Sequence, residues 1–143
     1  MMIDKEHVLC SAQAVTADAD ATNVIDLQNV RHIGDGNGMS VFVQVGVAAD
    51  STTGDETYKF NVVTDDNASL SSDTIVVDRT IAAALLTAGS IHEIKIPQGA
   101  TLERYLGLAF DVGGTTPTIT VTAWLGETGS LPSVRTYANG YDV

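Results

Sequence analysis

Apolar and polar residues alternate with a period of two along most of this chain. The segment 39–48, MSVFVQVGVA, places Met39, Val41, Val43, Val45 and Val47 on one face of an extended strand. Five further segments show the same pattern, at 57–64, 73–78, 90–97, 104–112 and 117–125. Two shorter candidates, at 12–16 and 23–27, precede them. The pattern therefore predicts about eight short strands.

Clusters of Gly, Asp, Asn, Ser and Pro separate these strands, at 34–38, 49–56, 65–73, 97–101 and 113–117. Short strands with such turns are typical of an antiparallel sandwich or barrel. The one helical candidate, RTIAAALLTAG at 79–89, fits a short strand ended by Gly89 equally well. We predict an all-β antiparallel sandwich with little helix, as a single domain over residues 1–143. Residues 126–143, which lack sustained periodicity, form an irregular extension of it.

In the segment 111–126, DVGGTTPTITVTAWLG, a glycine pair lies beside hydroxyl side chains, and such a combination can form a phosphate-binding loop. A phosphate loop needs a helix N-terminus after it, but the residues after Pro117 favour a strand. Asp111 adds repulsion, and the loop holds no Lys. The segment is predicted to be a hairpin connection without a nucleotide site. In the strand that follows, Thr118, Thr120, Thr122 and Trp124 lie on the face opposite Ile119, Val121, Ala123 and Leu125.

Charge is the strongest compositional feature. Eighteen Asp and Glu face seven Lys and Arg, which gives a net charge of −11 at pH 7. Such a surface repels phosphate backbones, so no direct contact with nucleic acid is expected. No apolar run is long enough for a membrane span, and no secretory signal is recognisable at the N-terminus. No membrane partner is expected, and a reducing cytosol is the simplest site of synthesis.

Candidate catalytic and metal-binding residues are few. His7, His32 and His92 lack the close spacing of a metal site, and no nucleophile motif occurs, so we expect neither enzymatic activity nor a cofactor. Cys10, the only cysteine, is expected to be a buried or inert thiol. The best calcium candidates are residues 35–38 and 65–67, although Asp, Asn and Gly are also ordinary turn residues.

At this stage, three stretches together resemble the Bbp16-type capsid cement (decoration) proteins of tailed bacteriophages. They are MIDKEHVLCSAQAVTADADATNVIDL, VVTDDNASLSSDTIV and LTAGSIHEIKIPQGATLERYLGLAFDVGGTTPTITVTAWL. The match covers most of residues 2–126, and its specificity comes from the order and spacing of short pieces. The resemblance implies a jelly-roll-like sandwich on the outer surface of the virion, made in the host cytoplasm. Its expected partners are the major capsid protein and further copies of itself, as a homotrimer.

The two terminal segments, 3–15 and 131–143, are the expected contact regions of such a protein. Both lie outside the strongest strand pattern and carry apolar or aromatic residues, although each segment could equally fold back on its own domain. The candidate interface residues are Ile3, Val8, Trp124, Leu131, Tyr137 and Tyr141. Two alternatives stay open: a carbohydrate-binding or adhesion sandwich, with Trp124 as a possible exposed platform, and a small β-fold enzyme.

Overall fold

The computed structural model describes residues 3–29, 31–32 and 38–130, with the side chains of 31–32 left undescribed. Its long strands are β1 (Val8–Val15), β5 (Met39–Val47), β6 (Thr57–Asp65), β7 (Thr74–Thr80), β8 (Ile91–Lys95), β10 (Tyr105–Gly113) and β11 (Ile119–Glu127). Shorter pieces are β2 (Ala19–Asp20), β3 (Ile25–Asp26), β4 (Arg31–His32) and β9 (Thr101–Leu102). Two single turns of 3₁₀ helix complete the described chain, η1 (Lys5–His7) and η2 (Ala83–Leu85).

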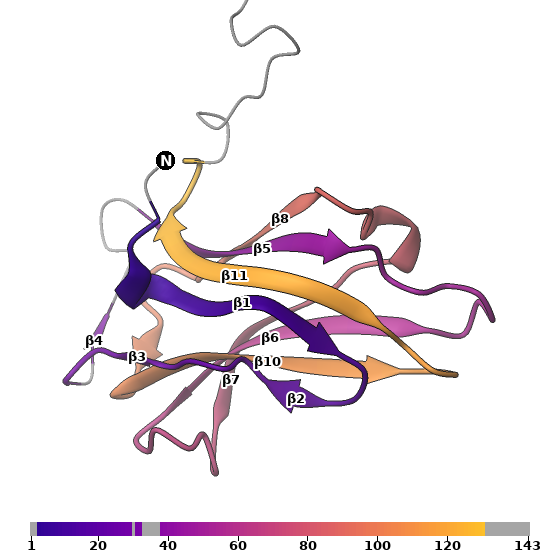
Figure 1. Ribbon diagram of the computed structural model, residues 1–143. Coiled ribbons are helices and arrows are strands. Elements are labelled where there is room, and N and C mark those ends of the chain that lie inside the picture. Colours follow the sequence, from indigo (N-terminus) through magenta and orange to yellow (C-terminus); the bar gives the residue numbers. More distant parts are fainter. Residues whose placement is uncertain (1–2, 30, 33–37, 131–143) are drawn as a thin grey trace, which may run out of the picture.

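The long strands form two antiparallel sheets that face each other (Figure 1). One sheet has the order β1-β11-β5-β8, and the other has the order β2-β10-β6-β7, with β3 also paired to β10. The chain passes between the sheets after β1, β5, β7 and β10, and it also does so between β3 and β5 and between β8 and β10, where the short strands β4 and β9 pair with each other; among the described strands, only β6 and β7 follow one another as neighbours in one sheet. This strand order is that of a jelly roll, and it confirms the predicted all-β sandwich.

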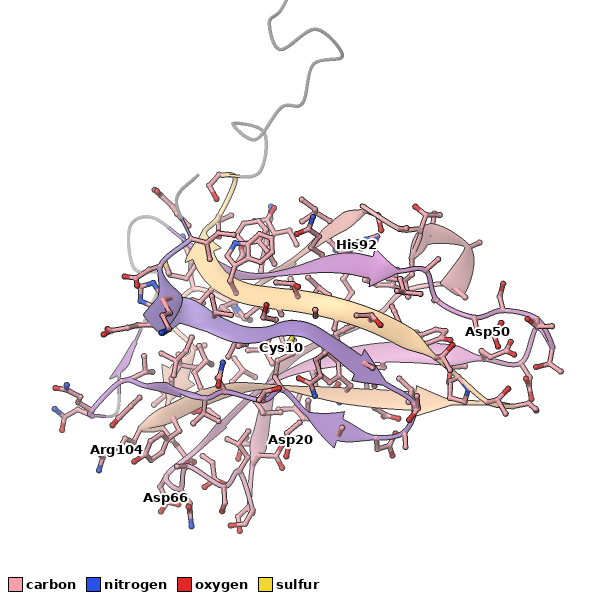
Figure 2. The ribbon with its side chains drawn as sticks, viewed as in Figure 1. Cys10, Asp20, Asp50, Asp66, His92 and Arg104 are labelled. Atoms are coloured by element: carbon pink, nitrogen blue, oxygen red, sulfur yellow. The ribbon has the colours of Figure 1, made fainter. Side chains whose placement is uncertain are left out.

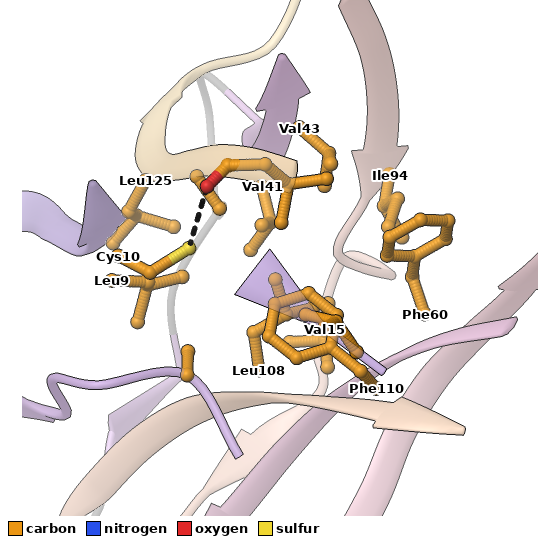
Figure 3. Close-up of a cluster of buried hydrophobic side chains, with 14 of the residues drawn as sticks. Leu9, Cys10, Val15, Val41, Val43, Phe60, Ile94, Leu108, Phe110 and Leu125 are labelled. Atoms are coloured by element: carbon orange, nitrogen blue, oxygen red, sulfur yellow. Dashed lines mark hydrogen bonds between the residues drawn. The ribbon is translucent and has the colours of Figure 1, made fainter. Parts of the chain in front are cut away.

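The core lies between the two sheets and is built from the inward positions of the alternating pattern (Figure 3). Val41, Val43 and Val45 contribute from β5, and their partners in β11 point the same way. From the other sheet, Phe60 and Phe110 meet edge to face, with their ring centroids 6.0 Å apart. Burial of these side chains is the main stabilising term of the fold, because each removes apolar surface from water.

The predicted hairpin at 113–117 is wrong. β10 and β11 belong to different sheets, so the segment between them crosses the end of the sandwich as an arch. Gly114 has φ +94°, and a Cβ there would lie 2.5 Å from the carbonyl oxygen of Asp55. The arch therefore packs directly on the loop between β5 and β6, which crosses the sandwich at the same end. Alternation identifies the faces of two strands, but it does not say whether they pair.

The strand predicted at 12–16 begins earlier, at Val8. Leu9 and Cys10 are both buried, although they are neighbours in sequence. The cause is irregular pairing: the register of β1 against β11 shifts twice, and Ala12 has φ +47°. Such bulges break the period-two pattern, so alternation in the sequence does not predict this half of the strand. Most of the segment 3–15 thus belongs to the first sheet rather than lying outside the strands.

The segment 79–89 contains only one turn of helix. β7 continues to Thr80, η2 spans Ala83–Leu85, and Gly89 has φ +85°. The inward side chains of Ile81 and Leu86 belong to the core on either side of this turn. The alanine-rich stretch is therefore a connection between the two sheets, and the prediction of little helix is confirmed.

Candidate functional site

The three histidines lie on three separate elements. His7 is in η1, His32 is in β4 and His92 is in β8. His92 Nε2 lies 3.1 Å from the hydroxyl of Ser90. Burial first, and then the charge of Arg79, lower the pKa of His92 below its ordinary value. The lower pKa favours the neutral form of this half-buried imidazole, and among the described residues His92 is not part of a cluster that could hold a metal ion.

Cys10 is fully buried beneath β11, and its Sγ lies 3.7 Å from the carbonyl oxygen of Val121 (Figure 3). Burial raises the pKa of the thiol to about 11. The nucleophilic form of cysteine is the thiolate, which is scarce at neutral pH when the pKa is so high. Cys10 is therefore a packing residue, as the sequence predicted.

Among the described residues, the carboxylates of Asp65, Asp66 and Glu103 are close enough to hold a metal ion, with ligand atoms within 4.8 Å of one another. Sequence had pointed to residues 65–67 but not to Glu103, which is distant along the chain. Asp65 already accepts hydrogen bonds from the backbone N–H groups of Asn67 and Ser72, at 3.0 and 2.8 Å. It therefore acts as the anchor of the β6–β7 loop. The second calcium candidate, residues 35–38, falls mainly outside the described residues.

A hollow of about 400 Å³ opens on the outer face of the second sheet. We call it the Asn61 hollow; its lining residues are Asp18, Ala19, Asp20, Asn61, Ala109, Phe110 and Asp111. It lies where β2, β6 and β10 run side by side, close to the position of Asp20 in Figure 2. Nothing in the sequence singles out this hollow, because Asn61 has the pattern of an ordinary polar residue on the outward face of a strand.

A second hollow of about 380 Å³ is lined by Glu6, His7, Ile25, Asp26 and Gln28. One of its two carboxylates, that of Asp26, is already paired with a cation. Arg104 donates from Nε and Nη2 to the two oxygens of Asp26, each at 3.0 Å. This guanidinium pair holds the pKa of Asp26 below its ordinary value, helped by the N–H of Gln28. The arrangement ties β3 to the residue that precedes β10, so the Asp26 carboxylate has a structural role.

Trp124 is not an exposed platform. It lies on the outward face of β11, as its place in the alternation predicted, but it is only 2% exposed. Its ring stacks on that of Phe42 from the neighbouring β5, with centroids 5.8 Å apart and planes at 21°. Tyr58 is also fully buried, which leaves Tyr105 as the half-buried aromatic residue in the described chain outside the core. The proposed carbohydrate platform therefore lacks its tryptophan.

The comparisons with known proteins bear on this jelly roll, which shows an acidic hollow and no assembled catalytic group in its described residues. A model of the Bbp16 family matches residues 9–125. The chain belongs to the Bbp16 family. Because this is a family of phage-type structural proteins, the chain is a structural protein of phage virions. The matched range begins in β1 and ends in β11, so it spans the whole sandwich.

Two other comparisons add little. No curated protein matches the chain. Among solved structures, the structure of infectious bursal disease virus Gx strain is similar, with 14% identity and a TM-score of 0.32. That match covers 86% of this chain and 31% of the viral chain, so this chain spans about a third of its length. The assignment to the Bbp16 family rests on the family match.

The candidate interface residues differ in their exposure, and some of them lie outside the described residues. Ile3 is 47% exposed, ahead of η1, and Val8 is half-buried where β1 pairs with Trp124 of β11. Leu131, Tyr137 and Tyr141 lie outside the described residues. Within the described part of the chain, three further large apolar side chains are exposed, namely those of Val47, Ile75 and Leu85. Except for Trp124, every candidate interface residue also lies outside the range that the family model matches.

Proposed function

We propose that this protein is a capsid cement protein. It binds the outer surface of a phage head, bridges neighbouring major capsid subunits and stabilises the shell against the pressure of packaged DNA. The observation that carries the proposal is the match of the Bbp16 family over the whole sandwich. We further propose that the role is purely structural, without catalysis or a cofactor.

The physical basis of such a role is linkage. A protein that binds the assembled lattice more tightly than separate subunits adds its binding free energy to the stability of the lattice. It must therefore transmit force between subunits without deforming. The jelly roll suits this task, because close-packed interiors are stiff and its long strands are hydrogen-bonded together in two sheets.

We propose that the protein binds as a homotrimer. Three linked copies that touch several capsid subunits bind as a multivalent unit, so each further contact forms at a high effective concentration. A stable contact between two proteins buries on the order of 1,200–2,000 Å² in total. We assign the contacts to the residues before β1 and to residues 131–143.

The charge supports an exterior position. With a net charge of −11, the protein is repelled by the DNA that fills the head. An acidic exterior also keeps the free protein apart from other copies until a specific contact forms.

Binding to purified heads tests the proposal directly. The full chain is mixed with expanded empty heads of the phage that encodes it and with unexpanded procapsids, and bound protein is measured after sedimentation. We expect saturable binding to expanded heads, and the number of bound copies at each site should be a multiple of three. Analytical ultracentrifugation of the free protein shows whether the trimer forms before binding. An absence of binding to expanded heads contradicts the proposal.

A further inference from the structure

The Asn61 hollow lies along a row of directly paired residues on the outward face of the second sheet. Asp20 pairs with Ala109, Ala109 pairs with Asn61, and Asn61 pairs with Asp78, across β2, β10, β6 and β7. Directly paired residues project on the same side of a sheet. Because Ala109 carries only a methyl group, it forms the floor of the hollow between longer neighbours.

Asn61 is buried at a position where a strand normally meets water. Only 7% of it is exposed. The neighbouring strands contribute to this burial, because Asn61 pairs with Ala109 of β10 on one side and with Asp78 of β7 on the other. The Oδ1 atom of Asn61 has no hydrogen-bond partner within the described residues. A buried amide oxygen without a donor is costly, and such groups are rare unless a ligand or partner satisfies them.

Carboxylates surround this amide. Asp18, Asp20 and Asp111 line the hollow, and none of its described lining residues is basic. Burial, together with repulsion from Asp73, raises the pKa of Asp20 above its ordinary value. One positive charge lies on the same face: Lys59 pairs with Asp111 across β6 and β10, and its Nζ lies 3.6 Å from Asp78, so a single lysine is shared among several carboxylates. The hollow therefore has an excess of negative charge that a cation would relieve.

The arrangement favours an extended cation over a metal ion. In the described chain, the three lining carboxylates are not among the groups whose oxygens converge within 4.8 Å. A guanidinium carries five N–H donors in a planar fork and no acceptor. It can donate to separated carboxylates and to an amide oxygen at the same time, and arginine is enriched at protein interfaces for this reason.

We propose that the Asn61 hollow receives a basic side chain, arginine in the first place, from the capsid protein on which this chain sits. This inference rests on the proposed cement function and names one of its contacts. It also orients the sandwich, because it turns the outward face of the β2-β10-β6-β7 sheet toward the shell. Asp20 and Asp111 supply the charge, and Asn61 accepts one of the N–H groups.

A titration with a small probe tests the hollow without any capsid. The ¹⁵N-labelled full chain is titrated with N-acetylarginine methylamide, with the uncharged citrulline analogue and with calcium chloride. We expect shifts in the backbone amides of Ala19, Ala109 and Val112 and in the side-chain amide of Asn61, with the arginine probe alone. The proposal is overturned if no shifts occur, if the citrulline analogue gives equal shifts, or if only calcium gives shifts.

Charge-neutral variants give the matched comparison. Asp20→Asn and Asp111→Asn each remove one carboxylate from the hollow. Each should weaken binding of the arginine probe about fivefold, which corresponds to the free energy of one partly exposed ion pair. Glu127→Gln removes an exposed carboxylate of the other sheet and should leave it unchanged. Equal binding by all four proteins contradicts the assignment.

The same variants on heads separate this inference from the proposed function. If the wild-type protein binds expanded heads and the double variant Asp20→Asn/Asp111→Asn binds less tightly, with Glu127→Gln unaffected, both stand. If the double variant binds heads as tightly as the wild type, the hollow is not the contact and the cement function survives. If the wild type itself does not bind, the cement function fails, whatever the probe does.

Discussion

The phenol of Tyr58 holds the backbone of Thr118 across the end of the sandwich. Its oxygen accepts the N–H of Thr118 at 3.2 Å, and its hydroxyl donates to the carbonyl oxygen of Asp50 at 2.8 Å. Tyr58 belongs to β6, whereas Thr118 lies in the β10–β11 arch and Asp50 in the β5–β6 arch. One fully buried side chain therefore fastens two of the crossings of the chain at this end.

Tyr58→Phe is expected to keep the fold but to lower the free energy of unfolding by about 1–3 kcal/mol, because it removes two part-buried hydrogen bonds to the backbone of Asp50 and Thr118. Urea denaturation measures this loss. Tyr105→Phe is the matched control, since Tyr105 is half-buried near the opposite end of β10 and its ring, which lies under Arg104, is retained. A loss in Tyr58→Phe no larger than in the control contradicts the fastening role.

The arch itself is tested at two glycines. Gly54 and Gly114 both have positive φ, +80° and +94°, but only at Gly114 does an added Cβ meet backbone atoms within 4 Å. Gly54→Ala should cost about 1 kcal/mol of stability through backbone strain alone. Gly114→Ala should cost roughly 3 kcal/mol or more, since the arch must also move away from Asp55. Equal losses would show that the arch does not pack as described.

The two arches that Tyr58 contacts show which features of the fold can be predicted from the sequence and which cannot. The strand at 39–47 and the inward faces of β5, β6 and β11 follow from the alternation, because a half-buried strand repeats every two residues. The arch at 114–118 does not, since a five-residue turn-forming segment can join strands of one sheet or of two. Choosing between them needs the contact of Gly114 with a loop almost sixty residues earlier in the chain.

The candidate site was harder to predict for a similar reason. Asn61 lies on the outward face as the pattern requires, but its low exposure depends on the strands on either side of it, β10 and β7, and on the residues around β2 that line the same hollow. Likewise, Trp124 lies on the predicted face, and only the neighbouring strand brings Phe42 onto its ring. Alternation assigns a side chain to a face, whereas exposure on that face depends on what loops and neighbouring strands cover.

Stability should fall in acid, and Asp65 should account for part of the slope. The N–H of Ser72, followed by that of Asn67, holds the pKa of this carboxyl below its ordinary value, against the opposing effect of burial. Its contribution is present above the unfolded-state pKa of about 3.9 and is lost as pH falls through the lower folded-state value.

Urea midpoints between about pH 7 and pH 3 measure this dependence. Asp65→Asn should be less stable than the wild type at neutral pH, and the difference should shrink in acid as the wild-type carboxylate is protonated. Glu127→Gln controls for the removal of one negative charge from an exposed position. A difference between Asp65→Asn and the wild type that is independent of pH contradicts this role of the carboxylate.

Removal of residues 131–143 should separate folding from binding. The core cluster in the described chain lies between Leu9 and Leu125, so a protein that ends at Ser130 is expected to keep its stability within about 1 kcal/mol. We expect its affinity for expanded heads to fall. Thermal denaturation and sedimentation with heads measure the two properties. A truncated protein that fails to fold would instead assign this segment to the core.

The central claim is that this protein strengthens a phage shell. Heads that lack the protein are heated with and without the purified full chain, and release of their DNA is followed with a fluorescent dye. The cement role predicts that added protein raises the temperature of DNA release, with saturation at the stoichiometry of binding. An unchanged release temperature on heads that are saturated with the protein would contradict it.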